Sequence, residues 1–124
     1  MVPRILYIED NFENRMLVKR VLMAEGFEVI EAENAEIGID LALEYLPDLI
    51  LMDISMPHVD GLMATRHLRS LPELNHIPII AVTANVMKGD REETLQAGCD
   101  GYIPKPIDID RFPEQVMEYL RNGR

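Results

Sequence analysis

Residues 48–61 read DLILMDISMPHVDG, and this stretch decides the fold prediction. Its four consecutive apolar residues, Leu49 to Met52, run directly into a carboxylate, Asp53, before the chain turns at Pro57. A short, uninterrupted apolar run is typical of a strand that is buried on both faces of a parallel sheet. A charge at the end of such a strand costs free energy unless a partner compensates it, so Asp53 indicates a functional site.

Short apolar runs alternate with longer segments of helical periodicity along the whole chain. The predicted strands are RILYI (4–8), EVIEA (28–32), LILMD (49–53), IIAVT (79–83) and GYIP (101–104). Strict alternation of strand and helix predicts a parallel sheet with right-handed crossovers and helices on both faces. We therefore predict a doubly wound α/β fold.

Apolar residues at helical spacing mark four of the five expected helices. They are Leu17, Val18, Val21 and Leu22 in a first helix that stops at Gly26, Ile37, Leu41 and Tyr45 in a second that is closed by Pro47, Ala64, Leu68 and Leu71 in a third, and Phe112, Val116 and Leu120 in a fifth that begins at Asp110. In the fourth helix, the stretch from Lys88 to Thr94, KGDREET, contains no apolar residue, so we expect this helix to be the least firmly attached element. Both a solvated surface helix and a mobile, functional helix fit this composition.

The composition is that of an ordinary globular protein, with 124 residues, of which 48% are hydrophobic and 27% are charged. This length predicts one domain that occupies residues 1–124. The net charge of −10 argues against direct nucleic-acid binding, which needs a clustered basic surface. No apolar run is long enough to span a membrane and the N-terminus lacks the apolar core of a signal peptide, so we expect no membrane insertion. The single Cys99 cannot form an internal disulfide, and a cytoplasmic location is the expectation.

Polar side chains follow four of the five predicted strands. Glu9 and Asp10 come after the first strand and Asp53 ends the third. Thr83 ends the fourth strand and Lys105 follows the fifth. In a parallel α/β sheet, ligands bind beyond the carboxyl ends of the strands, near the point where the strand order reverses. We therefore expect these five side chains to converge at one edge of the sheet.

Three carboxylates at one edge would repel one another, and some would take up protons unless a cation were present. Oxygen ligands from two or three residues, with room for water, suit Mg²⁺ better than Ca²⁺ or Zn²⁺. The histidines have no metal-ligand spacing and are expected on the surface. The competing explanation is that Glu9 and Asp10 cap the first helix while Asp53 pairs with Lys105. That explanation accounts for the pairs but not for five polar groups at four strand ends.

The expected chemistry is phosphoryl acceptance by the protein itself. The loop EDNFEN (9–14) has no run of glycines or hydroxyls that could cradle a phosphate, which argues against a flavin site and against a P-loop. A carboxylate oxygen can attack phosphorus and form an aspartyl-phosphate. A cation and Lys105 would neutralise the phosphoryl oxygens, and Thr83 could donate a further hydrogen bond.

At these strand ends the chain resembles the response-regulator receiver family, the phosphoacceptor domains of two-component signalling. The matching motifs are IED (8–10), LILMDISMPHVDG (49–61), AVTA (81–84) and YIPKPI (102–107). Each motif is weak alone, but all four occur in order and at strand ends, and the resemblance covers essentially the whole chain. It implies a CheY-like, flavodoxin-like (βα)5 fold whose five-stranded sheet has the order 2-1-3-4-5.

The resemblance implies a role for each residue around the acceptor. Asp53 would accept the phosphoryl group, and Asp10 would be the principal ligand of Mg²⁺, which Mn²⁺ could replace. Glu9 would assist through water, at a position where many members of the family carry Asp. Ser55 would offer its backbone carbonyl to the metal.

The resemblance further implies how phosphorylation becomes a signal. Lys105 would bind the phosphoryl group, held in place by a cis peptide bond before Pro106. Thr83 would move toward that group and Tyr102 would turn inward, which would change the surface formed by the fourth helix, the fifth strand and the fifth helix. Two small neutral residues would tune the lifetime of the aspartyl-phosphate without serving as a base: Ser55 and Asn85.

The implied partners are a histidine kinase or a histidine phosphotransfer protein as phosphoryl donor, and a downstream protein that reads the changed surface. The first helix and the neighbouring loops are the donor-docking surface by family analogy. No nucleic acid is expected as a direct partner, and the chain is expected to be a monomer or a weak dimer. It would catalyse only its own phosphorylation and dephosphorylation, so we do not expect an enzyme with a separate substrate. A stand-alone regulator and a receiver excised from a larger protein both remain open.

Two other functions compete with phosphoryl acceptance for signalling. A Mg²⁺-dependent phosphohydrolase would also form an aspartyl-phosphate, but such enzymes commonly place a general acid two residues after the nucleophile, where this chain has Ser55. The chain also has no inserted cap that could form a substrate pocket. A degenerate receiver would act only as a protein-binding module, but the intact set of strand-end residues argues against it.

Overall fold

The computed structural model describes residues 2–54, 61–84 and 88–123, with the backbone alone for residues 88–91. The strands are β1 (Arg4–Ile8), β2 (Glu28–Ala32), β3 (Leu49–Asp53), β4 (Ile79–Thr83) and β5 (Gly101–Pro104). The helices are α1 (Phe12–Ala24), α2 (Ala35–Tyr45), α3 (Gly61–Ser70), α4 (Lys88–Ala97) and α5 (Phe112–Asn122). All the strands have the bounds predicted from the sequence. Of the helices in the described part of the chain, none combines the length and the apolar character needed to cross a membrane.

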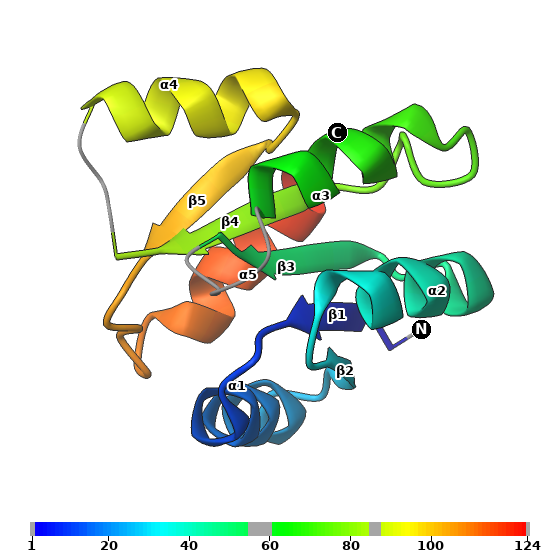
Figure 1. Cartoon of the computed structure of the whole chain (residues 1–124). Helices are drawn as coiled ribbons and strands as arrows, with labels where there is room; N and C mark the ends of the chain where they lie inside the picture. The colour runs from blue at the N-terminus through cyan, green and yellow to red at the C-terminus, as the bar shows by residue number, and fades with distance from the viewer. Residues whose placement is uncertain (1, 55–60, 85–87, 124) are drawn as a thin grey trace.

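The strands form one parallel sheet in the order β2-β1-β3-β4-β5, which confirms the predicted fold. Figure 1 shows α2, α3 and α4 on one side of the sheet and α1 and α5 on the other. The strand order reverses at β1, because β2 is added on one side of it and the later strands on the other. Doubly wound folds bind their ligands beyond the carboxyl ends of the strands at this switch point.

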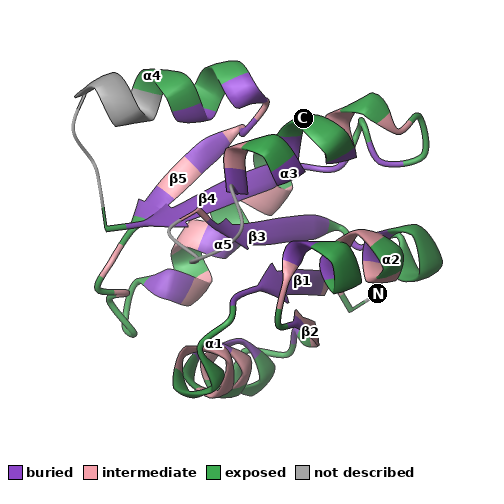
Figure 2. Cartoon of the chain, viewed as in Figure 1, coloured by how far each residue is buried: buried purple, intermediate pink, exposed green. Residues whose placement is uncertain are grey.

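Alternate residues of the central strands supply the two cores on either side of the sheet. In β1, Leu6 and Ile8 face the core with α2 and α3, while Ile5 and Tyr7 face the core with α1 and α5. Every residue of β3 and β4 is buried, as Figure 2 shows. Burial on both faces is the physical reason that these strands read as uninterrupted apolar runs.

The second helix presents a different face to the sheet from the one that its large apolar residues suggested. Ile37 and Tyr45 are 37% and 41% exposed, whereas Gly38 and Ala42 are buried. Gly38 lies so close to β1 that a Cβ there would overlap with the side chain of Ile8. Small residues let the helix approach the sheet closely, so the spacing of the large residues predicted the helix but not its buried face.

The structure refines the start of the fifth helix and gives the bounds of the fourth. Helix α5 begins at Phe112 rather than at Asp110, with Pro113 in its first turn, where the missing N–H costs no hydrogen bond. Helix α4 extends to Ala97, and of its described side chains Thr94 and Ala97 are buried. The described part of α4 is therefore attached through small side chains rather than through a large apolar face.

Candidate functional site

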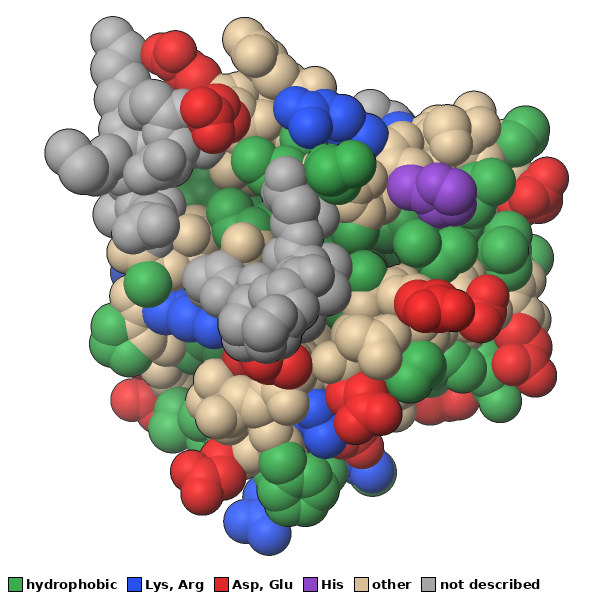
Figure 3. Space-filling view, in the orientation of Figure 1, with side chains coloured by type: hydrophobic (Ala, Val, Ile, Leu, Met, Phe, Trp, Pro, Cys, Tyr) green, Lys and Arg blue, Asp and Glu red, His purple; other side chains and the backbone are tan. Residues whose placement is uncertain are grey.

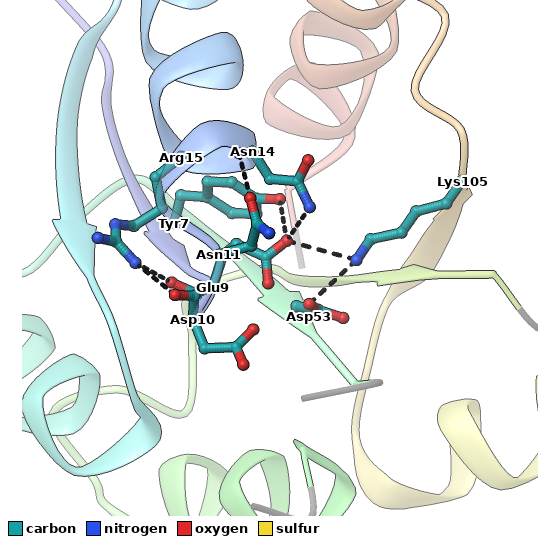
Figure 4. Close-up of polar contacts among 8 residues, drawn as sticks. All are labelled: Tyr7, Glu9, Asp10, Asn11, Asn14, Arg15, Asp53 and Lys105. Atoms are coloured by element: carbon teal, nitrogen blue, oxygen red, sulfur yellow. Dashed lines mark hydrogen bonds and ion pairs between the residues drawn. The ribbon is translucent and has the colours of Figure 1, made fainter. Parts of the chain in front are cut away.

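The carboxyl ends of β1 and β3 bring the predicted acidic side chains together. The two strands are neighbours in register, so Glu9 and Asp53 lie side by side. The Glu9 amide donates to the carbonyl of Ala32 at 2.9 Å, which extends the pairing of β1 by one residue. Carboxylate oxygens of Glu9, Asp10 and Asp53 all lie within 4.8 Å of one another (Figure 4).

Lys105 supplies the positive charge beside these carboxylates. Its Nζ donates to Asp53 Oδ2 at 3.0 Å and to Glu9 Oε1 at 3.4 Å. Its backbone N–H donates to the carbonyl of Thr83 at 2.8 Å, and the peptide bond to Pro106 is cis, as the resemblance implied. Partial burial lowers the pKa of Lys105, but the hydrogen bond and charge of Asp53, together with those of Glu9, outweigh burial and raise the pKa above its usual value.

One ammonium does not balance the charges of three carboxylates. Glu9 and Asp53 are 1% and 2% exposed, while Asp10 is open to solvent. The pKa of Glu9 is raised to about 7, first because the side chain is buried and next because it lies directly beside the Asp53 carboxyl group. A carboxyl group that holds a proton near neutral pH marks a site that is short of positive charge, which a divalent cation could supply.

The Glu9 carboxylate has one saturated oxygen and one without a partner. Oε1 accepts a hydrogen bond from Asn14 Nδ2 at 2.8 Å and from the Tyr7 hydroxyl and Lys105 Nζ, each at 3.4 Å. Oε2 is buried and has no hydrogen-bond partner among the described residues. In Figure 4 it lies on the side of the other two carboxylates. The three oxygen donors and this unpartnered oxygen fit Mg²⁺, which prefers hard carboxylate ligands and retains water.

The acidic pair after β1 does not cap the first helix. Asn11 is the N-cap of α1, and its side chain accepts a hydrogen bond from the backbone N–H of Asn14 at 2.8 Å. Arg15 donates to the backbone carbonyls of Glu9 and Asp10, at 2.7 and 3.1 Å, and so holds the acidic loop in place. The competing explanation of the sequence is therefore wrong about the caps, although the lysine–carboxylate pair that it invoked is present.

Sequence reasoning missed four residues around Glu9: Tyr7, Asn11, Asn14 and Arg15. Asn11 carried a usable signal, because Asn directly before a helical segment is a typical N-cap. Tyr7 carried a weaker one, since residues two apart in a strand point to the same side. The contacts of Asn14 and Arg15 depend on where α1 lies relative to β1, which the local pattern does not contain.

The residues predicted to form the switch lie at β4 and β5. Thr83 is 3% exposed at the end of β4. Tyr102 is half-buried in β5 and packs against the core on the side of α2 and α3. Its carbonyl accepts a hydrogen bond from the Tyr119 hydroxyl at 3.3 Å. Two predicted site residues lie outside the described residues: Ser55 and Asn85.

The surface around these elements carries charges of both signs. Figure 3 shows acidic side chains spread over the visible face, with basic side chains scattered among them. His67 and His76 are exposed, as predicted, and His58 lies outside the described residues.

The sequence matches one protein family over nearly its whole length, since the model of the response regulator receiver domain covers residues 5–117. The chain therefore belongs to the response regulator receiver family. This receiver is 48% identical to the polar-differentiation response regulator DivK of Brucella anthropi over 120 residues, which are 97% of this chain and 98% of that protein. DivK of Brucella ovis matches over the same shares of both chains at 47% identity. The chain is thus a receiver domain of two-component signalling rather than an enzyme that acts on a separate substrate.

Solved structures share the architecture of this receiver. The receiver domain of the sensor histidine kinase PA1611 from Pseudomonas aeruginosa is 33% identical, with a TM-score of 0.87 over 98% of this chain and 99% of that one. Its crystal structure contains a magnesium ion coordinated in the active-site cleft. The chemotaxis protein CheY4 of Vibrio cholerae shares the fold, with 21% identity and a TM-score of 0.91 over 95% of this chain and 98% of that one.

Proposed function

We propose that this receiver accepts a phosphoryl group on Asp53 from a phosphohistidine donor, either a histidine kinase or a histidine phosphotransfer protein. The observation that carries the proposal is the position of the Asp53 carboxylate at the end of a buried strand, 3.0 Å from Lys105 Nζ and beside the carboxylates of Glu9 and Asp10. One receiver domain spanning residues 1–124 would contain this whole site.

Mg²⁺ is the cofactor that fits the acidic cluster, and Mn²⁺ would replace it because it prefers similar oxygen ligands. Asp10 would be the principal ligand, with Asp53 and the backbone carbonyl of Ser55, and Glu9 would assist through water. When bound, the cation supplies Lewis-acid neutralisation of the phosphoryl oxygens. The magnesium ion in the PA1611 receiver and the unpartnered oxygen of Glu9 support this assignment.

The transfer needs position and charge from the protein rather than further covalent chemistry. A carboxylate oxygen of Asp53 attacks phosphorus while the phosphorus–nitrogen bond of the donor breaks, and the electron pair of that bond leaves with the imidazole. The Lys105 ammonium, already beside Asp53, would turn to one phosphoryl oxygen, and the Thr83 hydroxyl would donate to another. Each donor would neutralise charge that the transition state carries on these oxygens.

The same residues would carry the signal from the acceptor to the surface. Thr83 and Lys105 are joined by a backbone hydrogen bond of 2.8 Å, so a shift of one acts on the other. Thr83 would move toward the phosphoryl group, and the half-buried Tyr102 would turn into the space that it leaves. The surface of α4, β5 and α5 would then bind a downstream protein. Two residues would tune the lifetime of the aspartyl-phosphate: Ser55 and Asn85.

The charge of the receiver favours protein partners over nucleic acid. Its net charge is −10, and the basic side chains on the face in Figure 3 are scattered rather than gathered into a patch. We expect a monomer or a weak dimer, without membrane insertion.

The test is phosphorylation by a small donor such as acetyl phosphate, with and without Mg²⁺, read by intact mass. We expect one phosphoryl group on the wild type when Mg²⁺ is present, and none on Asp53→Asn. Asp40→Asn is the matched control, because Asp40 is an exposed carboxylate on α2, and it should be phosphorylated like the wild type. Phosphorylation of Asp53→Asn would contradict the proposal, as would a wild type that gains no phosphoryl group and gives no response to beryllofluoride.

A further inference from the structure

We propose that Tyr7 and Asn14 are positioning residues, which fix the Glu9 carboxylate so that one of its oxygens is presented to the cation. The inference rests on the proposed function, because it assumes that the acidic cluster holds Mg²⁺. It gives a role to a buried phenol and a half-buried amide that the transfer step itself does not use.

Tyr7 reaches Glu9 along the same strand. Residues two apart in a strand point to the same side, and Glu9 extends β1 by one residue. The Tyr7 hydroxyl donates to Glu9 Oε1 at 3.4 Å, and Glu9 is its one hydrogen-bond partner among the described residues (Figure 4). Tyr7 is fully buried, and a phenylalanine would fill the same apolar space without a polar group to satisfy. The contact with Glu9 is therefore the structural reason for a tyrosine rather than a phenylalanine at position 7.

Asn14 reaches the same oxygen from the first helix. Its Nδ2 donates to Glu9 Oε1 at 2.8 Å, an ordinary length for an N–H donor, and this bond is shorter than the one from Tyr7. Asn14 is held in turn by the helix cap, because its backbone N–H donates to the side chain of Asn11 at 2.8 Å. The amide is thus a fixed donor, placed on the opposite side of the carboxylate from the acidic cluster (Figure 4).

These contacts leave the Glu9 carboxylate with one available oxygen. Tyr7, Asn14 and Lys105 all donate to Oε1, whereas Oε2 is buried without a partner among the described residues. A buried carboxylate oxygen is costly unless something binds it, and Oε2 lies on the side of the other two carboxylates. If Lys105 turns to the phosphoryl group during transfer, Tyr7 and Asn14 are the donors that stay with Glu9.

The same geometry accounts for a glutamate at position 9. Its longer side chain carries one oxygen to Tyr7 and Asn14 while the other remains with the acidic cluster. The carboxylate of an aspartate would lie one methylene group closer to the backbone, away from the position in which Tyr7 and Asn14 contact Oε1 of Glu9. We therefore expect Glu9→Asp to lose the contacts with Tyr7 and Asn14, which makes it the partner for a double-mutant cycle.

The experiment is a Mg²⁺ titration of the unphosphorylated protein, followed by backbone-amide NMR, which gives a dissociation constant without phosphoryl transfer. The variants are Tyr7→Phe, which removes one oxygen atom, and Asn14→Leu, which removes the amide donor and keeps the branched shape and the number of heavy atoms. For Asn14→Leu we expect the dissociation constant to rise about tenfold, as is typical for residues that orient a metal ligand, and for Tyr7→Phe less, because its bond is longer. Tyr119→Phe is the matched control, since it removes a hydroxyl bonded to a backbone carbonyl of β5, and it should bind Mg²⁺ like the wild type.

The outcomes separate this inference from the proposed function. In a Glu9→Asp background the two substitutions should have little further effect on Mg²⁺ affinity. Wild-type affinity in both variants, with spectra that show an intact fold, would overturn the positioning role even if Asp53 is phosphorylated. Weakened affinity in the variants would support the positioning role even if the wild type gains no phosphoryl group, in which case the proposed function alone fails.

Discussion

Glu9 is the residue at which burial and charge conflict most strongly. It is 1% exposed and lies beside a second buried carboxylate, and its pKa is raised to about 7. Without a cation, the folded protein must therefore bury either a proton or an extra negative charge at this point. Tyr7 and Asn14 satisfy one oxygen of the carboxylate, and the other is the one that would face the cation, through water.

We expect the stability of the cation-free protein to fall as the pH rises from about 5 to about 7. The pKa of Glu9 is raised from 4.5 to about 7 in the folded protein, so in this window the folded state binds a proton that the unfolded chain has lost. Stability falls through this window because loss of the proton favours the unfolded chain, and the total change is on the order of 1–3 kcal/mol by about pH 7. Urea unfolding in EDTA measures it, and Glu9→Gln, which cannot titrate, should remove this part of the slope. An unchanged slope in Glu9→Gln would assign the effect to another group.

Lys105 is the residue whose charge the phosphoryl transfer needs most directly. We expect Lys105→Met to slow phosphorylation of Asp53 by acetyl phosphate about 100-fold, as is typical for the loss of one group that stabilises transition-state charge. Intact mass against time measures the rate. Lys19→Met is the matched control, because Lys19 pairs with Glu31 at 3.2 Å on a partly exposed surface, where ion pairs contribute little. Equal slowing in both variants would contradict a specific role for Lys105.

At the scale of elements, glycines decide how closely two of the helices approach the sheet. Gly38 lets α2 pack against Ile8 in β1. Gly101 does the same for α5, because a Cβ at Gly101 would lie 2.5 Å from the Tyr119 ring. The Tyr119 hydroxyl also donates to the carbonyl of Tyr102 at 3.3 Å. Helix α5 is thus attached to β5 directly beside the tyrosine that we propose as part of the switch.

Adding a methyl group at Gly101 should destabilise the receiver through this contact. We expect Gly101→Ala to lower the free energy of unfolding by about 1–3 kcal/mol, the usual range for overpacking. Urea unfolding measures the change. In a Tyr119→Leu background the same substitution should cost less, because the ring that the new Cβ would meet is absent. An equal cost in both backgrounds would show that the Tyr119 contact is not the cause.

At the scale of the whole molecule, the acidic cluster links folding to cation binding. Its carboxylates come from the ends of two strands that are far apart in the sequence, and they meet only when the sheet has formed. A ligand that binds the folded state and not the unfolded chain stabilises the fold by mass action. A cation bound to the acidic cluster would therefore raise the free energy of unfolding of the whole receiver.

Mg²⁺ should raise the free energy of unfolding of the wild type by about 2.7 kcal/mol at a concentration 100 times its dissociation constant. Asp10→Asn should abolish this gain, because it removes the proposed principal ligand while changing only an exposed side chain. Asp40→Asn, also exposed, should keep it. Thermal unfolding with Mg²⁺ and with EDTA measures the difference, and an equal gain in Asp10→Asn would place the cation elsewhere.

Much of the architecture could be read from local patterns. The predicted bounds of all five strands agree with the structure. For β3 and β4, which are buried throughout, burial on both faces requires the uninterrupted apolar runs that the sequence contains. Alternation of strand and helix implied parallel strands, whose carboxyl ends share one edge. That rule alone led to the expectation that Glu9, Asp53 and Lys105 would meet. In the structure, Lys105 donates a hydrogen bond to each of the two carboxylates.

The fold was needed wherever a contact depends on how two elements pack. The buried face of α2 follows from the close approach at Gly38, which a search for large apolar residues overlooks. The hydrogen bonds from Tyr7 and Asn14 to Glu9 connect strand β1, the loop after it and the first turn of α1. Periodicity in the sequence reports which side of an element is apolar. Periodicity does not report which side chains of two neighbouring elements will contact each other. Those contacts depend on how the connection between the two elements places one against the other.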